Sequence, residues 1–274
     1  MIEVIGQSLS KEMTLAQKIC KVREELQILT LKSLHEKKYF NNIAFVGGTA
    51  LRLLYNTSRY SEDLDFSLIN TKDYDFHKLN QSISAFFKLN NIKLEAQPKT
   101  HNTIHSVFLK FTDILQQLNV SAVDNQKLSI KLEIDTNPPN GYDTEYFPFS
   151  GAHLFSVTAY DLPSMFSGKL HACYCRKYTK GRDFYDLIWY LSKKIKPNFT
   201  LLNNAVIQTE HKNLHIKENN FTEFIDVILD KTDLNKARND VEKFLFYPQE
   251  AEMINKNTFT ALLKNYNAKN QKLF

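Results

Sequence analysis

The amino-acid sequence predicts an α/β (α+β) fold in which a part with mixed strands and helices precedes a helical part. Up to about residue 157, short apolar runs typical of strands alternate with amphipathic segments. Beyond Pro163 the apolar residues recur only at helical spacing. The 274 residues, of which 43% are hydrophobic and 24% charged, also provide enough apolar surface for a core. We therefore expect a mixed sheet in residues 1–160 and helices in residues 161–274.

The elements of the first part follow from local patterns. A helix over 16–35 is predicted by apolar side chains near helical spacing. The run Ile-Ala-Phe-Val at 43–46 is stopped by Gly47 and Gly48, which predicts a short buried strand. Thr49 is expected to cap a helix over 50–55. A second strand is expected at 64–68 and an amphipathic helix at 74–89.

Further strands are expected at 92–96, 104–111, 128–134 and 154–157. In the second part, Phe184, Leu187, Ile188 and Leu191 mark one face of a helix. Other helices are expected at 221–229, 234–245 and 259–266. We place the boundary between the two parts near 158–163.

Composition narrows the class of protein. There are 35 Lys and Arg against 30 Asp and Glu, a formal charge of +5 that is compatible with a polyanionic partner. Three cysteines, Cys20, Cys173 and Cys175, are too few for a disulfide framework and indicate a reducing compartment. We find no secretory signal and no apolar run long enough to cross a membrane, so we expect a soluble cytoplasmic protein without membrane partners.

The stretch from residue 45 to residue 68 carries the most chemical information. Two glycines between a strand and a helix would let a phosphate approach the backbone N–H groups at the helix N-terminus. Asp63 and Asp65 follow, and residues two apart on a strand point to the same face. Such close carboxylates repel each other unless a cation lies between them. Mg²⁺ suits them because it takes hard oxygen ligands together with substrate phosphates. The alternative is an edge strand with solvated acids.

A third carboxylate is expected in the alternating run Lys131-Leu-Glu-Ile-Asp135. Glu133 and Asp135 share one strand face, so either residue could complete a metal-binding triad. Glu133 lies between two apolar residues in the strand, whereas Asp135 meets a turn marked by two prolines. We favour Glu133.

A third cluster of charged residues lies in the helical part. Asp183 and Asp186 are three residues apart and therefore on one helix face. Lys169, on the preceding helix, could neutralise a triphosphate as a compact cation. Arg176 and Arg182 could do the same or could pair with the aspartates. The alternative is a solvated helix with local ion pairs.

In this combination the sequence resembles the AbiEii/AbiGii toxin family of nucleotidyltransferases, which includes the mycobacterial MenT proteins. The resemblance covers about residues 43 to 191 and rests on three blocks in the expected order. The blocks are Gly47-Gly-Thr-Ala-Leu51 leading to Arg59-x-Ser-x-Asp-Leu-Asp-Phe66, then Lys169, then Arg182-Asp-x-x-Asp-Leu187.

The resemblance implies a DNA-polymerase-β-like nucleotidyltransferase core, followed by a helical C-terminal domain that completes the active site. It implies that Gly47, Gly48 and Thr49 hold the triphosphate, with Ser61 and Arg182 also near the nucleotide. Asp63 and Asp65 would bind Mg²⁺. The third ligand is not singled out by the family pattern. Lys169 matches the family's lysine, and Asp183 or Asp186 matches its late aspartate.

The resemblance further implies a toxin of a type IV toxin–antitoxin or phage-defence system, with a cognate antitoxin or promoter-encoded partner. Some family members transfer nucleotides from an NTP to the 3′ end of tRNA and so stop translation. We expect attack of a hydroxyl on the α-phosphorus, with pyrophosphate leaving. The alternatives are transfer to a small molecule or to a protein hydroxyl, and an inactive nucleotide-binding module.

Overall fold

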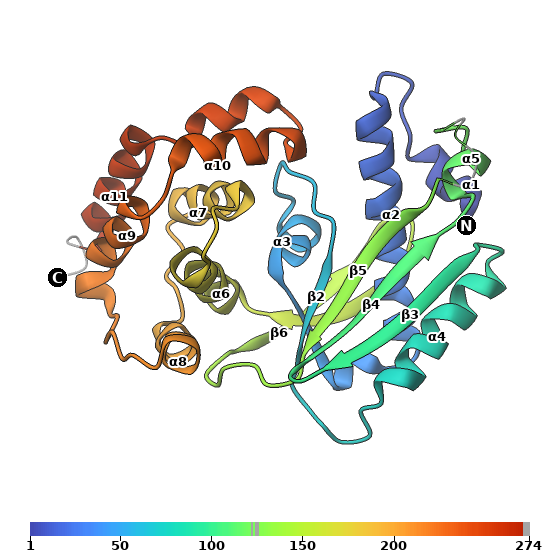
Figure 1. The fold of residues 1–274 in the computed structure, drawn as a ribbon, viewed down its shortest axis with the longest axis horizontal. Coiled ribbons are helices and arrows are strands. Elements are labelled where there is room, and N and C mark those ends of the chain that lie inside the picture. The colour runs from blue at the N-terminus through green and yellow to red at the C-terminus, as the bar shows by residue number, and fades with distance from the viewer. Residues whose placement is uncertain (122, 124–125, 271–274) are drawn as a thin grey trace. The chain divides into compact units, whose positions relative to one another are not determined.

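The computed structural model describes residues 1–121, 123 and 126–270 of the chain, which forms two compact units (Figure 1). The first unit comprises Met1–Leu54, Tyr60–Pro138 and Thr144–Ala159. The second unit comprises Tyr55–Arg59, Pro139–Asp143 and Tyr160–Phe274. Two short segments that precede Tyr160 in the chain therefore belong to the second unit.

The strands are β1 (Ile43–Val46), β2 (Leu64–Leu68), β3 (Leu94–His101), β4 (Ile104–Phe111), β5 (Leu128–Asp135), β6 (Thr144–Phe149) and β7 (Phe155–Tyr160). The α-helices are α1 (Ile2–Gln7), α2 (Leu15–Glu36), α3 (Gly47–Tyr55), α4 (Phe76–Leu89), α5 (Ile114–Gln117), α6 (Leu162–Cys175), α7 (Gly181–Ser192), α8 (Phe199–Glu210), α9 (Phe221–Asp230), α10 (Leu234–Val241) and α11 (Lys256–Asn270). Short 3₁₀ helices are η1 (Tyr39–Asn41), η2 (Glu218–Asn220), η3 (Glu242–Phe244) and η4 (Pro248–Met253).

The seven strands form one mixed sheet in the order β3-β4-β5-β2-β1-β7-β6. The pairs β1–β2, β3–β4 and β4–β5 are antiparallel, whereas β1–β7 and β2–β5 are parallel. Helix α4 packs on β3, helix α2 packs on β5, and the two helices contact each other (Figure 1). The mixed sheet with its helices confirms the predicted α/β class.

Residue alternation explains why the central strands stay in this register. In β5 the residues Leu128, Ile130, Leu132 and Ile134 are buried, and the residues between them are partly or fully exposed. A slip by one residue would turn this apolar row away from the core. The half-buried row, which includes Glu133 and Asp135, therefore keeps a fixed face.

The structure corrects several predicted boundaries. Helix α3 begins at Gly47 rather than residue 50, so Thr49 lies inside the helix and does not cap it. Strand β3 spans Leu94–His101 instead of 92–96, because it pairs along its whole length with β4. Helix α10 ends at Val241 and continues as the 3₁₀ helix η3. Strand β6 and helices α1, α5 and α8 were not among the predicted elements. Strands β1, β2 and β4 are confirmed as predicted.

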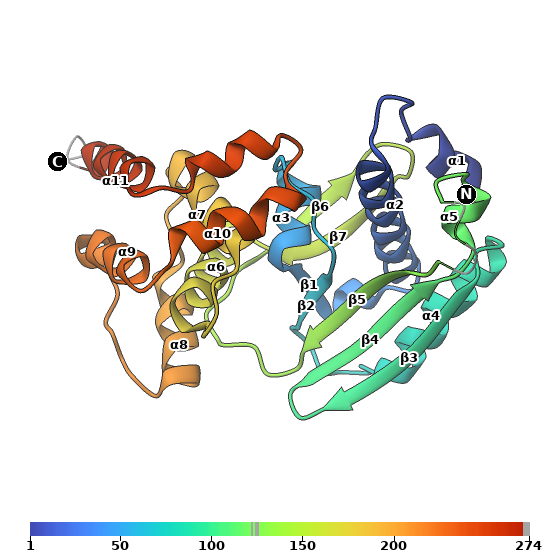
Figure 2. The same ribbon diagram turned by 45° about the horizontal axis from the view of Figure 1, so that its top comes forward.

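The second unit is built from helices α6 to α11 (Figure 2). Helix α7 packs against α6, α10 and α11, and α6 also packs against α8. The side chains that hold α6 and α7 together are aromatic in part: the rings of Phe166 and Tyr190 stack with centroids 4.4 Å apart. In the described residues, no helix combines the length and apolar character that crossing a bilayer requires.

Candidate active site

Helix α3 begins directly after β1 with Gly47 and Gly48, two residues without side chains. Gly47 has a φ of +80°, a backbone conformation that L-residues with side chains rarely adopt. A Cβ at this position would lie 2.6 Å from Oδ2 of Asp65. The Asp65 carboxylate therefore occupies the place of the missing side chain. The backbone N–H groups at the start of α3 form a site that attracts anions.

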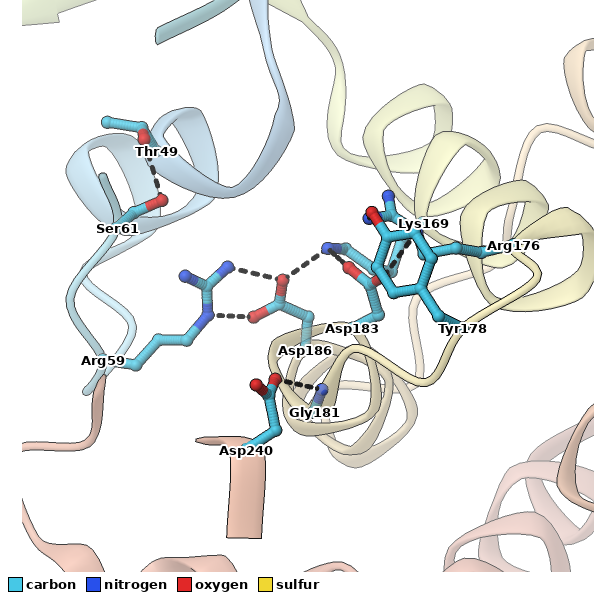
Figure 3. Close-up of polar contacts among 10 residues, drawn as sticks. All are labelled: Thr49, Arg59, Ser61, Lys169, Arg176, Tyr178, Gly181, Asp183, Asp186 and Asp240. Atoms are coloured by element: carbon cyan, nitrogen blue, oxygen red, sulfur yellow. Dashed lines mark hydrogen bonds and ion pairs between the residues drawn. The ribbon is translucent and has the colours of Figure 1, made fainter. Parts of the chain in front are cut away.

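Thr49 ties this turn to the segment that precedes β2. Its side chain is buried, and its hydroxyl lies 2.8 Å from Oγ of Ser61 (Figure 3). The same hydroxyl donates a hydrogen bond to the Asp63 carbonyl oxygen. The Ser61 carbonyl oxygen accepts a hydrogen bond from the Gln27 side chain of α2 at 3.2 Å. Thr49 and Ser61, both predicted to contact the nucleotide, thus hold the backbone of the aspartate segment in place.

The β2–β5 register places two acidic residues side by side. Asp65 pairs with Glu133, and Ser67 pairs with Asp135. Asp65 also pairs with Val46, the last residue before the glycine turn. Asp63 lies directly before Leu64, the first residue of β2, and is half-buried like Asp65. The first unit therefore brings Asp65 and Glu133 together next to the start of α3.

Glu133 and Asp135 differ in their surroundings. The Glu133 carboxylate pairs with Nζ of Lys131 at 2.8 Å, and both side chains are about one-third exposed. Asp135 Oδ1 accepts a hydrogen bond from the Asn137 backbone N–H at 2.9 Å, as expected for a residue that starts a turn. Burial raises the pKa of Asp135, and this hydrogen bond offsets only part of that effect. The register favours Glu133 as the neighbour of Asp65.

The carboxylate oxygens of Asp65 and Glu133 are ligands of the kind that Mg²⁺ prefers. Among the residues that the structure describes, no group of three or more His, Cys, Asp or Glu side chains is gathered to hold a metal ion. Mg²⁺ commonly uses only one or two carboxylates and completes its shell with substrate phosphates and water. A phosphate bound at the start of α3 would also lie near the Asp65 carboxylate. The two negative charges would repel each other unless a cation lay between them.

The second unit contains a buried network of charged side chains (Figure 3). Arg59 donates two hydrogen bonds to Asp186, from Nε to Oδ1 and from an Nη to Oδ2, each at 2.6 Å. Lys169 Nζ lies 2.8 Å from Asp186 Oδ2 and 2.7 Å from Asp183 Oδ1. Arg176 Nε is 3.4 Å from Asp183 Oδ2. Arg59 and Asp186 are at most 1% exposed, so these charges lie in the interior.

The network shifts the pKa values of Asp183, Asp186 and Lys169 toward the charged form of each group. Burial alone would raise the pKa of Asp186, but Arg59 and Lys169 outweigh burial and lower it. Asp183 behaves in the same way, with a pKa lowered chiefly by Lys169. Burial alone would lower the pKa of Lys169, yet the two carboxylates raise it. All of these groups are therefore ionised at neutral pH.

Arg182 and Gly181 lie at the start of α7. The guanidinium carbon of Arg182 is 3.9 Å from the ring centroid of Phe244. The Gly181 backbone N–H donates to Oδ2 of Asp240 at 2.8 Å (Figure 3). Asp240 thus satisfies one of the backbone groups that α7 leaves unpaired at its N-terminus.

Arg59 is the member of the network that sequence reasoning assigned no role. It precedes Asp186 by 127 residues, so no local spacing connects the two. The available signal was its position in the block Arg59-x-Ser-x-Asp, where an arginine lies near acidic residues. The structure shows that Arg59 pairs with the late Asp186 within the second unit.

The family model described as nucleotidyl transferase AbiEii toxin, type IV TA system, matches residues 30–265. No curated protein matches the chain. The fold is similar to that of JHP933 from Helicobacter pylori, with a TM-score of 0.48 and 17% identity over 97% of this chain and 100% of that chain. It is also similar to a proposed nucleotidyltransferase from the same organism, with a TM-score of 0.48 and 17% identity over 92% of this chain and 99% of that chain.

Proposed function

Because the chain belongs to the AbiEii family of nucleotidyl transferase toxins of type IV toxin–antitoxin systems, we propose that it transfers a nucleotide from an NTP to the 3′ end of tRNA. The modified tRNA can no longer serve in translation. A cognate antitoxin counteracts the protein in a toxin–antitoxin or phage-defence system.

The observation that carries this proposal is the pairing of Asp65 with Glu133 beside Gly47. Two carboxylates on neighbouring strands, next to a helix start without side chains, suit a substrate that brings both phosphates and a metal ion. The Gly48 and Thr49 backbone N–H groups bind phosphate oxygens in this proposal. The Thr49 hydroxyl positions the Asp63 backbone.

Asp63, Asp65 and Glu133 are the residues that would hold Mg²⁺. When bound, the ion supplies charge neutralisation at the phosphate oxygens of the substrate. Its carboxylate ligands lie on β2, on β5 and immediately before β2, elements whose register is fixed by buried neighbours. The backbone positions of Asp65 and Glu133 are therefore fixed before substrate binds, and Glu133 exchanges its ion pair with Lys131 for the metal ion.

The reaction is a nucleotidyl transfer. The acceptor hydroxyl oxygen forms a bond to the α-phosphorus, the bond from that phosphorus to the bridging oxygen breaks, and pyrophosphate leaves with the electron pair. The hydroxyl proton passes to a base, for which an Asp63 or Asp65 carboxylate oxygen is suited. Lys169, which matches the family's lysine, lies in the second unit. Asp183 and Asp186 fix the position of its ammonium group.

The test is transfer of label from NTPs radiolabelled at the α-phosphate, in the presence of Mg²⁺ and total tRNA. We expect label on tRNA with the wild-type protein and none with Asp65→Asn, which keeps the size of the side chain and removes its charge. Asp226→Asn is the matched control because Asp226 is exposed on α9. Label on the protein or on a small molecule would replace tRNA as the acceptor. Absence of label with every acceptor would overturn the proposed activity.

A further inference from the structure

The second unit contains an open hollow whose lining residues, apart from Asp183, have no role in the proposed chemistry. It lies at the end of α6, the start of α7 and the turn after α9. Its lining includes the connection between α6 and α7, residues 176–180, and Lys231 and Thr232 beyond α9. All of its lining residues belong to the second unit.

The hollow carries an excess of positive charge. Within the described chain, its lining includes four cationic side chains, those of Arg176, Lys177, Lys180 and Lys231, and one carboxylate, that of Asp183. This carboxylate is already paired with Lys169 and Arg176, so it does not neutralise the remaining cations. Burial and the neighbouring Arg182 lower the pKa of Lys180. An anion in the hollow would relieve this crowding of like charges.

Aromatic rings accompany the cations. Tyr178 is 62% exposed, and the Arg176 guanidinium carbon lies 5.3 Å from its ring centroid. Figure 3 shows the Tyr178 ring beside Arg176 in the connection between α6 and α7. Among the other lining residues, Lys231 Nζ lies 4.6 Å from the ring centroid of Tyr174. Basic side chains interleaved with accessible rings are typical of surfaces that bind single-stranded nucleic acid, where bases stack on the rings.

We propose that this hollow binds the acceptor strand of a single-stranded RNA end, with Lys180 and Lys231 contacting backbone phosphates and Tyr178 stacking on a base. The inference rests on the proposed function, because it names the surface that receives the acceptor. An NTP shares the phosphate chemistry, so the experiment separates an RNA strand from a nucleotide.

The experiment measures fluorescence anisotropy with a fluorescein-labelled single-stranded RNA of about eight nucleotides. We expect Lys180→Ala and Lys231→Ala each to weaken binding by roughly 3- to 10-fold. Each should also reduce the slope of log affinity against log salt concentration by about 0.7, the value for one lost phosphate contact. Lys212→Ala is the control, because Lys212 is exposed and does not line the hollow.

The stacking part of the proposal is tested at Tyr178. Tyr178→Ala should weaken RNA binding by roughly 5- to 10-fold, whereas Tyr178→Phe, which keeps the ring, should bind within about 2-fold of wild type. Calorimetric titration with ATP should give the same affinity for all variants. RNA affinity equal to that of the Lys212→Ala control in all three alanine variants would overturn the proposal. A loss of ATP binding with normal RNA binding would assign the hollow to the nucleotide and would also overturn it.

These outcomes are separate from those of the transfer assay. A protein that transfers label to tRNA, but whose RNA affinity does not depend on Tyr178, Lys180 or Lys231, refutes the hollow and leaves the proposed activity intact. A protein that binds RNA through these residues and transfers no label refutes the activity and supports the hollow.

Discussion

Asp186 illustrates how the interior of the second unit tolerates charge. Its carboxylate is fully buried, and it is stable there because Arg59 and Lys169 supply three hydrogen-bonded or ion-paired contacts. A buried ion pair contributes little compared with an apolar pair, but removal of one partner leaves an uncompensated charge in a low-dielectric interior. Replacement of Arg59 or Lys169 should therefore lower the free energy of unfolding by more than the net contribution of the ion pair.

Arg59→Met should destabilise the protein by about 3 kcal/mol, because methionine fills part of the volume and leaves Asp186 with Lys169 alone. The measurement is the free energy of unfolding in urea. Lys93→Met is the matched control: the Lys93–Asp113 pair has the same 2.6 Å separation, but Lys93 is 70% exposed. This exposed pair is screened by water, so the control should unfold at nearly the same urea concentration as the wild type. Equal losses in the two variants would contradict the importance of burial.

The same network predicts a pH dependence of stability. The folded-state pKa values of Asp183 and Asp186 are lowered, so the unfolded state binds protons more readily than the folded state. Their contribution is fully present above the unfolded pKa of about 3.9 and is lost as the pH falls from there through the lower folded values. Urea midpoints measured between about pH 7 and about pH 3 should fall steeply only below about pH 4. A midpoint that stays constant to the lowest pH would rule out this linkage.

Glu133 and Asp135 can be separated by conservative substitutions. Glu133→Gln keeps size and hydrogen bonding but removes the charge beside Asp65, so transfer activity should fall at least about 100-fold, the range seen for loss of one charge-stabilising group. Asp135→Asn should keep most activity, because Asp135 lies opposite Ser67 and accepts a turn hydrogen bond. Both variants are compared in the tRNA-labelling assay. An inactive Asp135→Asn together with an active Glu133→Gln would exchange the two assignments.

For single residues, the sequence indicates which side chains share one face of a strand or helix. It does not indicate which residues of different elements contact each other. Period-two alternation was enough to place Glu133 and Asp135 on one side of β5. The preference for Glu133 came from its place between two apolar residues, whereas its position opposite Asp65 depends on the register with β2, which a single sequence does not specify. Arg59 and Asp186 meet across 127 residues, and their pairing depends on tertiary packing alone.

The crossing of α7 and α10 depends on a close approach of their backbones. A Cβ at Gly181 would lie 1.9 Å from the Ala237 carbonyl oxygen and 2.8 Å from the Val241 nitrogen. Both atoms are backbone atoms of α10, which cannot rotate away as a side chain could. The glycine allows the helices to approach and allows Asp240 to reach the Gly181 N–H.

Gly181→Ala should therefore destabilise the protein by about 3 kcal/mol, at the upper end of the usual cost of overpacking. Gly168→Ala is the matched control. Gly168 is also helical, but a Cβ there meets no heavy atom within 4 Å. This control should stabilise α6 by roughly 0.5–1 kcal/mol, since alanine reduces the backbone entropy lost on folding. Thermal unfolding followed by circular dichroism compares the two variants, and a stable Gly181→Ala protein would show that α10 can shift.

Elements with strong local signals were the most predictable. Strand β1 was predicted to the residue because its apolar run is stopped by two glycines. Strand β6 was missed because Pro148 within it argues against a strand and its residues are mostly exposed. It lies at the edge of the sheet, where a proline is tolerated. The start of α3 was placed three residues late, because glycine is a poor helix former and the tertiary contact with Asp65 was not visible in the sequence.

On the scale of the whole molecule, the second unit is discontinuous in sequence. Besides Tyr160–Phe274 it includes Tyr55–Arg59 and Pro139–Asp143. The first of these segments supplies Arg59 to Asp186. The second supplies Asp143, whose carbonyl oxygen accepts a hydrogen bond from the Asp161 N–H and whose N–H donates to the Ser164 side chain. A division of the chain near residue 160 therefore removes parts of this unit.

A fragment comprising residues 160–274 should not fold cooperatively, because Asp186 would be buried without its bidentate partner. Differential scanning calorimetry of the fragment should show no sharp transition. In the same fragment, Asp186→Asn removes the buried charge that lacks its arginine partner. This variant should regain part of its helical circular dichroism signal. A cooperative transition of the unmodified fragment near that of the full chain would contradict the prediction.

The contact between Gly47 and Asp65 has a consequence for how the gene can change. Glycine codons are defined by their first two bases, and every single-base change at those positions yields a residue with a Cβ or a stop codon. Each such residue would bring its Cβ within 2.6 Å of the Asp65 carboxylate and would also have to adopt a φ of +80°. Every amino-acid substitution that a single base change produces at position 47 would therefore disturb Asp65, the partner of Glu133. Point mutations there are a direct route by which a lineage carrying this gene loses its activity.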